Sequence, residues 1–174
     1  MDSIQVRALR EVGDREIQQL GDVLIDCVEG GASVSFMLPI ARDTAVAFWR
    51  SVAAGVASGE RILIVAEDAA GSIIGTVQVL FAQAENQPHR ADVAKMLVHR
   101  RARRRGVGAA LLAVAEGAAL DAGKTLLVLD TASGEAERLY ARLGWRRCGV
   151  IPDYALLPGG GFCDTTFFYR ALKQ

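Results

Sequence analysis

Residues 96–109 read MLVHRRARRRGVGA, an apolar run followed by five arginines within six residues and by Gly106 and Gly108, which open a helical pattern. A helix N-terminus carries about half a positive charge and up to four unpaired N–H groups. Arginines directly before it are unfavourable by roughly 0.3–1 kcal/mol each unless an anion is present. Glycines let the backbone approach such an anion closely because they lack Cβ atoms. The stretch therefore predicts a strand, a phosphate-binding loop and a helix.

Two widespread kinds of phosphate-binding loop can first be compared with this stretch. A Walker A loop requires a lysine followed by Ser or Thr, and the stretch has no such lysine. A dinucleotide-binding fingerprint would use Gly106 and Gly108, with Asp130 following 22 residues after Gly108. Its third glycine position holds Leu111, however, and about seven residues separate Val98 from Gly106, whereas that fingerprint follows its strand directly. The stretch could also be a solvated basic loop that binds no phosphate, with glycines that only form the turn.

The hydrophobic period predicts an alternation of strands and helices along the rest of the chain. Strands are expected at residues 4–9, 62–66, 73–81, 92–98, 126–129, 145–151 and 165–171. Helices are expected from an N-cap at Asp14 to Gly30, from near Asp43 to position 56, over 107–122 and over 135–143. This order predicts an α/β protein with a mixed sheet and helices on both faces.

Composition limits the function further. The chain has 174 residues, 51% of them hydrophobic, which suits one domain with its own core. Its zero net charge argues against a generally basic nucleic-acid or membrane-surface protein. Cys27, Cys148 and Cys163 show no CxxC spacing, so neither a disulfide framework nor a zinc site is indicated. With no signal-peptide pattern and no membrane-spanning apolar run, the sequence predicts a soluble, cytoplasmic protein.

The motif Arg103-x-x-Gly106-x-Gly108 after a strand resembles the coenzyme A pyrophosphate loop of the GNAT-type N-acetyltransferases, whose pattern is Gln/Arg-x-x-Gly-x-Gly/Ala. Residues 139–145, LYARLGW, resemble the family's Leu-Tyr-x-x-x-Gly-Phe segment after its fifth strand. Ser133 stands nearest to the place of an Asn that the family carries before that tyrosine.

Two further segments, 30–37 and 90–98, resemble a toxin-resistance member of the family. The resemblance implies one GNAT-type domain over residues 1–174, with a mixed, mostly antiparallel sheet of about seven strands and about four helices on both faces. It implies acetyl-CoA as cosubstrate, no metal, and direct acetyl transfer to the primary amine of a small molecule, with an amino-acid-like toxin or antibiotic as one candidate. The coenzyme is then expected to contact Met96, Leu97, Val98, Arg103, Arg104, Arg105, Gly106, Val107, Gly108, Ala109 and Ser133.

The same resemblance implies roles for three polar residues. Tyr140 is expected to protonate the departing thiolate, because a phenol with a pKa near 10 is protonated at pH 7. The alternative is an aromatic residue on the buried face of a short helix. Asp130, at the C-terminal end of its strand, and Asp92, at the start of the neighbouring strand, are expected to flank the substrate and are the candidate bases for its amine. Helix capping or ion pairing is the alternative for each carboxylate.

Two regions complete the predicted site. The backbone of residues 96–98 is expected to polarise the thioester carbonyl, where pairing with the strand at 126–129 splays at a bulge. The acceptor pocket is expected to contain Gly31, Ser33, Ser35, Asp92, Asp130 and Tyr154.

Two other classes of function stay open. A nucleic-acid-binding module would use the arginines at 100–105, although no aromatic residue is interleaved with them. An acyl-CoA-binding regulatory or partner-docking protein would keep the fold without catalysis. Exposed strand edges near the C-terminus also suggest a homodimer.

Overall fold

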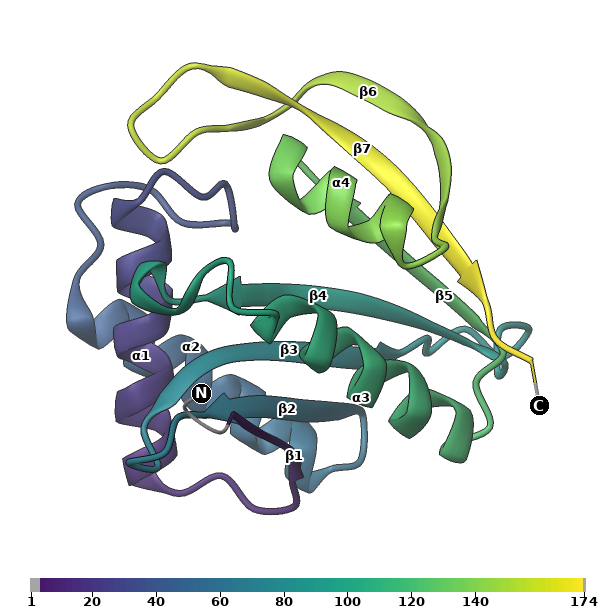
Figure 1. The fold of residues 1–174 in the computed structure, drawn as a ribbon, viewed down its shortest axis with the longest axis horizontal. Helices are drawn as coiled ribbons and strands as arrows, with labels where there is room; N and C mark the ends of the chain where they lie inside the picture. The colour runs from purple at the N-terminus through teal and green to yellow at the C-terminus, as the bar shows by residue number, and fades with distance from the viewer. Residues whose placement is uncertain (1–3, 174) are drawn as a thin grey trace.

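The structure of the protein, a computed structural model, describes residues 4–173 (Figure 1). Seven strands form one sheet in the order β1-β2-β3-β4-β5-β7-β6. Neighbouring strands are antiparallel except for the parallel pair β4–β5, which confirms the predicted mixed, mostly antiparallel sheet. The strands are β1 Gln5–Leu9, β2 Arg61–Glu67, β3 Ile73–Phe81, β4 Arg90–Val98, β5 Leu126–Thr131, β6 Arg146–Leu156 and β7 Phe162–Ala171.

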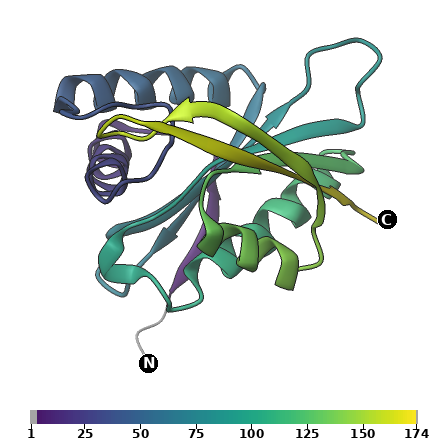
Figure 2. The same cartoon turned by 90° about the horizontal axis from the view of Figure 1, so that it is seen from above.

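Four α-helices cover the two faces of this sheet, as Figure 2 shows. The helices α1 (Asp14–Glu29) and α2 (Arg42–Ala57) lie on one face, and α3 (Val107–Asp121) and α4 (Gly134–Arg142) lie on the other. A short 3-10 helix, η1 (Arg100–Ala102), joins β4 to α3 and was not predicted. The predicted fold class is therefore confirmed.

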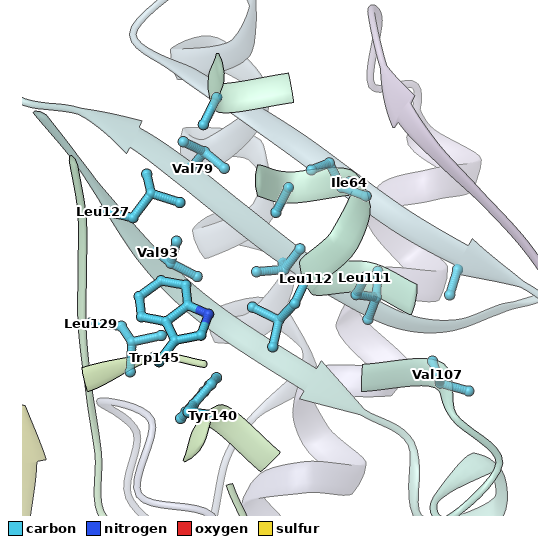
Figure 3. Close-up of a cluster of buried hydrophobic side chains, with 14 of the residues drawn as sticks. Ile64, Val79, Val93, Val107, Leu111, Leu112, Leu127, Leu129, Tyr140 and Trp145 are labelled. Atoms are coloured by element: carbon cyan, nitrogen blue, oxygen red, sulfur yellow. The ribbon is translucent and has the colours of Figure 1, made fainter. Parts of the chain in front are cut away.

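Two hydrophobic clusters hold these layers together. In β2, Leu63 packs in the cluster of α1 and α2, whereas its neighbour Ile64 packs in the cluster of α3. Because both faces are covered, this strand is apolar at every position from Leu63 to Ala66 instead of alternating. Figure 3 shows Ile64 beside Leu111 and Leu112 of α3.

The start of α1 differs from the prediction by one residue. Its N-cap is Gly13, and Asp14 is the first helical residue. The backbone N–H of Gly13 donates to Glu16 Oε2 at 3.1 Å. The Glu16 side chain, three residues later, thus satisfies the N–H group of the N-cap residue. Asp14 instead places a negative charge in the first turn, which the helix dipole favours.

The hairpin of β6 and β7 is longer than predicted. Strand β6 continues to Leu156 and β7 begins at Phe162, with a register shift between Ile151 and Ala155. Most residues of β6 are exposed, so this strand lacks the apolar alternation by which a half-buried strand is recognised. Strand β6 forms one edge of the sheet, and the homodimer suggested by such an edge stays a prediction.

Candidate active site

Strands β4 and β5 separate along their length. Their pairing covers three residue pairs, from Arg90 opposite Leu126 to Asp92 opposite Val128. Beyond that point β4 stays paired with β3, and β5 stays paired with β7. A cavity of about 880 Å³ opens between them and extends to α3, α4 and the loop after α1. The predicted splay is therefore present.

A β-bulge in β4 lies beside this opening. Two residues, Lys95 and Met96, oppose the single residue Val77 of β3. Lys95 has a φ of 50°, in the left-handed region, which costs a residue other than glycine on the order of 1–3 kcal/mol. The surrounding pairs of β3 and β4 hold it in this conformation.

The bulge reverses the faces of β4. Val93 and Leu97 are four residues apart and would share a face in a regular strand. Instead, Val93 packs in the cluster of α3 and Leu97 packs in the cluster of α1 and α2. The side chain of Lys95 lies on the side of α2 and the loop after α1, where it contacts Ser35 and Phe48.

The N-terminal turn of α3 forms one wall of the cavity. Gly106 is the N-cap, with a φ of 79°, and its neighbours Val107, Gly108 and Ala109 also line the cavity. A Cβ at Gly108 would lie 3.0 Å from Leu139 Cδ2 and 3.0 Å from Met96 Cε. Because Gly108 has no side chain, Leu139 of α4 and Met96 of β4 approach its backbone closely, beside the unpaired N–H groups of the first helical turn. These N–H groups can bind a phosphate group.

Four of the five arginines fall into two groups. Arg100 Nε pairs with Asp26 Oδ1 at 3.0 Å, and Arg101 Nη2 pairs with Asp68 Oδ2 at 3.4 Å. Carboxylates from α1 and the β2–β3 turn therefore pair with these two arginines and reduce the positive charge that they add at the loop. Arg103 and Arg104 line the cavity. The cavity lining does not include Arg105, the third arginine that was expected to contact the coenzyme.

Asp26 attaches this loop to α1. Its carboxylate accepts hydrogen bonds from the Arg100 backbone N–H at 2.8 Å and from Arg100 Nε at 3.0 Å. Burial raises the pKa of this carboxyl, but these hydrogen bonds and the charges of His99 and Arg100 outweigh burial and hold the pKa below its usual value of 3.8. A lowered folded-state pKa stabilises the fold above the unfolded value, and this contribution is lost as the pH falls through the folded one.

Replacing Asp26 by asparagine is therefore expected to lower the free energy of unfolding by about 1–2 kcal/mol at pH 7. The difference from the parent should shrink as the pH falls from 3.8 through the lower pKa of the folded state, because the carboxyl becomes protonated first in the unfolded state and then in both states. Urea unfolding of both proteins at pH 7 and at pH values below 3.8 measures this difference in the free energy of unfolding. Asp22→Asn is the control, because its ion pair with Arg42 is exposed and should contribute little. A difference that persists unchanged in acid would contradict this account.

Tyr140 lies on α4 and lines the cavity. Its side chain is 4% exposed and packs against the rings of Trp145 and Phe168, with centroids 5.8 Å and 5.7 Å away. Figure 3 shows it below Trp145. Burial and the charge of Asp130 raise the pKa of Tyr140 to about 12. It is thus a buried aromatic residue and also a protonated phenol on the cavity wall.

The structure separates the two candidate bases. Asp130 lines the cavity at the end of β5, and its Oδ2 accepts a hydrogen bond from Thr165 Oγ1 at 2.7 Å. Asp92 pairs with Arg90 Nη1 at 2.6 Å and is not part of the cavity lining. The ion-pair alternative therefore describes Asp92, and Asp130 is the carboxylate placed beside Tyr140.

The loop after α1 forms another part of the cavity wall. Gly31, Ser33 and Ser35 line the cavity. Ser33 Oγ donates to the carbonyl of Leu156 at 3.0 Å, so the loop is tied to the β6–β7 hairpin that arches over it in Figure 1. Tyr154 lies outside the cavity lining, 51% exposed, with its ring 5.9 Å from that of Phe167.

Ser133 lines the cavity as the N-cap of α4. Its Oγ accepts a hydrogen bond from the backbone N–H of Ala136 at 3.3 Å. The hydroxyl hydrogen can still donate, so Ser133 can contact a ligand through that hydrogen while it caps the helix.

Four charged residues of the cavity lining were missed in the sequence: Lys95, Glu135, Arg138 and Arg142. Arg138 and Arg142 are four residues apart and share a face of α4, a spacing that could have indicated them. No spacing in the sequence indicated Lys95, because the direction of its side chain depends on the bulge in β4.

Comparison with known proteins identifies the class. The sequence matches the family model of the acetyltransferase (GNAT) domain over residues 58–147, more than half of the chain. The chain therefore belongs to the GNAT acetyltransferase family, and the protein is an acetyl-CoA-dependent N-acetyltransferase. Two structures with this fold contain acetyl-CoA. Within residues 4–173, no group of three or more His, Cys, Asp and Glu side chains could hold a metal ion.

Solved structures share the fold at low sequence identity. A phosphinothricin acetyltransferase from Sinorhizobium meliloti, in complex with acetyl-CoA, is 18% identical with a TM-score of 0.80, covering 97% of this chain and 88% of that one. A Salmonella typhimurium protein with its cofactor acetyl-CoA is 19% identical (TM-score 0.77; 98% and 95% covered). A ribosomal-protein-alanine N-acetyltransferase from Brucella melitensis is 20% identical (TM-score 0.77; 97% and 99% covered).

None of the helices within residues 4–173 has the length and apolar character needed to cross a membrane.

Proposed function

We propose that the chain is one acetyltransferase domain that transfers the acetyl group of acetyl-CoA to the primary amine of a small, amino-acid-like molecule, such as a toxin or antibiotic. The observation that carries this proposal is the cavity between β4 and β5, which is lined both by the glycine-containing first turn of α3 and by a carboxylate and a phenol, Asp130 and Tyr140. The neighbour named for phosphinothricin and the resemblance of residues 30–37 and 90–98 to the tabtoxin resistance protein favour this acceptor class. The neighbour named for ribosomal-protein alanine has the same fold, so the acceptor must be tested.

The coenzyme phosphates are proposed to lie against the first turn of α3. The backbone N–H groups of residues 106–109 bind them, and Arg103 and Arg104 add positive charge on the same wall. The pantetheine arm lies along the open edge of β4 at residues 96–98 and beside Ser133. Acetyl-CoA supplies the activated acetyl group, and a backbone N–H of this edge polarises its carbonyl.

Two side chains are proposed to move the protons. Asp130 takes a proton from the acceptor ammonium, directly or through a water, so that the nitrogen lone pair can attack. Tyr140 holds its proton at pH 7, because its pKa is about 12, and gives it to the sulfur when the carbon–sulfur bond breaks. The negative charge of Asp130 contributes to the raised pKa of Tyr140, so the two groups interact electrostatically.

Replacing Asp130 by asparagine is expected to lower kcat/KM about 100-fold and to flatten its rise with pH, because the base is lost while an oxygen remains for Thr165. The pH profile of thiol release measures this. Asp92→Asn is the matched comparison and should keep the parental profile, because Asp92 pairs with Arg90 outside the cavity. The opposite ranking of the two variants would assign the base to Asp92.

The proposed function is tested by thiol release from acetyl-CoA over a panel of amines: amino acids, β-lactam amino acids, aminoglycosides, polyamines and peptide N-termini. Release with a small amino-acid-like amine supports the proposal, and release only with peptides would overturn the acceptor class. Tight acetyl-CoA binding without release for any amine would favour a regulatory acyl-CoA-binding protein. The nucleic-acid alternative loses support because Arg100 and Arg101 are paired with carboxylates.

A further inference from the structure

Lys95 is a half-buried ammonium group on the cavity wall. Its Nζ donates to Ser35 Oγ at 3.1 Å and lies 5.8 Å from the centre of the Phe48 ring. Among residues 4–173, no carboxylate lies within the 4.0 Å of an ion pair with Nζ. A partly desolvated cation without an anionic partner is unfavourable, so its retention on this wall calls for an explanation.

The backbone of Lys95 has a conformation that lysine rarely adopts. The residue is the extra member of the β4 bulge and has a φ of 50°, a conformation that glycine and asparagine adopt more readily. A bulge next to a binding site commonly directs a side chain toward that site. Here it directs a lysine toward Ser35, in the loop after α1 that lines the cavity.

The charges around Lys95 define what fits there. Burial lowers the pKa of Lys95 below 10.5, and the charge of Asp130 partly opposes this effect. Asp130 is thus close enough to interact electrostatically but too far to form an ion pair. One wall of the cavity therefore presents a cation and the opposing end of β5 presents an anion. This arrangement complements a zwitterion with an ammonium near Asp130 and an anionic group near Lys95.

We propose that Lys95, together with the Ser35 hydroxyl, forms a subsite for the carboxylate of the acceptor and thereby selects amines that carry an acid group. This inference rests on the proposed acetyl transfer and assigns its specificity to a residue outside the predicted acceptor set. Lys95 and the first turn of α3 lie on different walls, so its partner is the acceptor and not a coenzyme phosphate.

The test compares KM for two acceptors. One is the amino acid of the panel that is acetylated most efficiently, and the other is the carboxamide of the same amino acid. The parent should prefer the acid. Lys95→Met should raise KM for the acid about 10- to 100-fold, the effect of one lost charge-assisted hydrogen bond, and change KM for the amide less than about threefold. KM for acetyl-CoA should not change. Lys95→Arg should restore part of the preference because it restores the charge.

Lys124→Met is the matched control, because Lys124 also lies over a phenylalanine ring, with Nζ 4.6 Å from the centre of Phe81, but outside the cavity lining. An equal loss for acid and amide would show a structural role and overturn the proposal. A rise in KM for acetyl-CoA instead would assign Lys95 to the coenzyme. A parent that uses acid and amide equally well overturns this inference alone, whereas thiol release with no amine overturns the proposed function itself.

Discussion

Replacing Gly108 by valine is expected to weaken acetyl-CoA binding about 10- to 100-fold, from overpacking of roughly 1–3 kcal/mol. A Cβ at this position would already lie 3.0 Å from Leu139 Cδ2 and Met96 Cε. Both neighbours are ends of flexible side chains, so the folded protein can accommodate the valine by moving them. They would move into the space proposed for the pantetheine and pyrophosphate. Titration calorimetry with acetyl-CoA measures the loss.

The control for this variant is Gly117→Val on the same helix. A Cβ at Gly117 has no heavy atom within 4 Å among the described residues, so the same substitution meets no neighbour there. Its acetyl-CoA affinity should equal that of the parent, and both variants should unfold cooperatively. Parental affinity in Gly108→Val would show that the coenzyme phosphates bind elsewhere.

Replacing Tyr140 by phenylalanine is expected to lower kcat about 100-fold while the affinity for acetyl-CoA is retained, because general-acid catalysis contributes about that much. Phenylalanine keeps the ring that packs against Trp145 and Phe168, so the core should be preserved. Because the pKa of Tyr140 is about 12, the parent should show no loss of activity from deprotonation of this residue between pH 7 and 10. Stopped-time thiol assays across this range measure both effects.

Tyr169→Phe on β7 is the control, because this tyrosine is not part of the cavity lining. It should keep the parental kcat. If Tyr140→Phe also kept it, a different proton donor would serve the thiolate, and Tyr140 would be a packing residue alone. Loss of acetyl-CoA affinity in Tyr140→Phe would instead indicate that the hydroxyl binds the coenzyme.

The proposed binding of coenzyme phosphates is compatible with the zero net charge of the chain, because its charges are unevenly distributed. Two of the clustered arginines are tied to Asp26 and Asp68, which attach the loop to α1 and to the β2–β3 turn. The arginines on the cavity wall come from two segments, Arg103 and Arg104 before α3 and Arg138 and Arg142 on α4. These arginines therefore bring positive charge to the same cavity that the first turn of α3 lines.

Local patterns predicted the elements of the fold well. The apolar run at 62–66 and the helical period at 107–122 correspond to β2 and α3 because burial on two faces and helix geometry impose their own periods. The exposed end of β6 and the 3-10 turn η1 have no such period. They depend on pairing and on contacts with distant parts of the chain.

The candidate site was predictable only in part. Gly108 and Tyr140 were found because each belongs to a short motif with its own local geometry. Choosing between Asp92 and Asp130 required the structure, because both stand at the ends of strands. Arg90 pairs with Asp92, and the splay of β4 from β5 begins beyond Asp92, which leaves Asp130 on the cavity wall.

The sequence by itself determined the strand–loop–helix unit of residues 96–109, because glycine placement and apolar period act over a few residues. The tertiary structure decided which charges of that unit remain available and where Lys95 points. Arg100 and Asp26 are 74 residues apart, and their pairing depends on how α1 packs on the sheet. One extra residue in β4 reverses the face of every side chain beyond it, and that insertion is defined only by the register with β3.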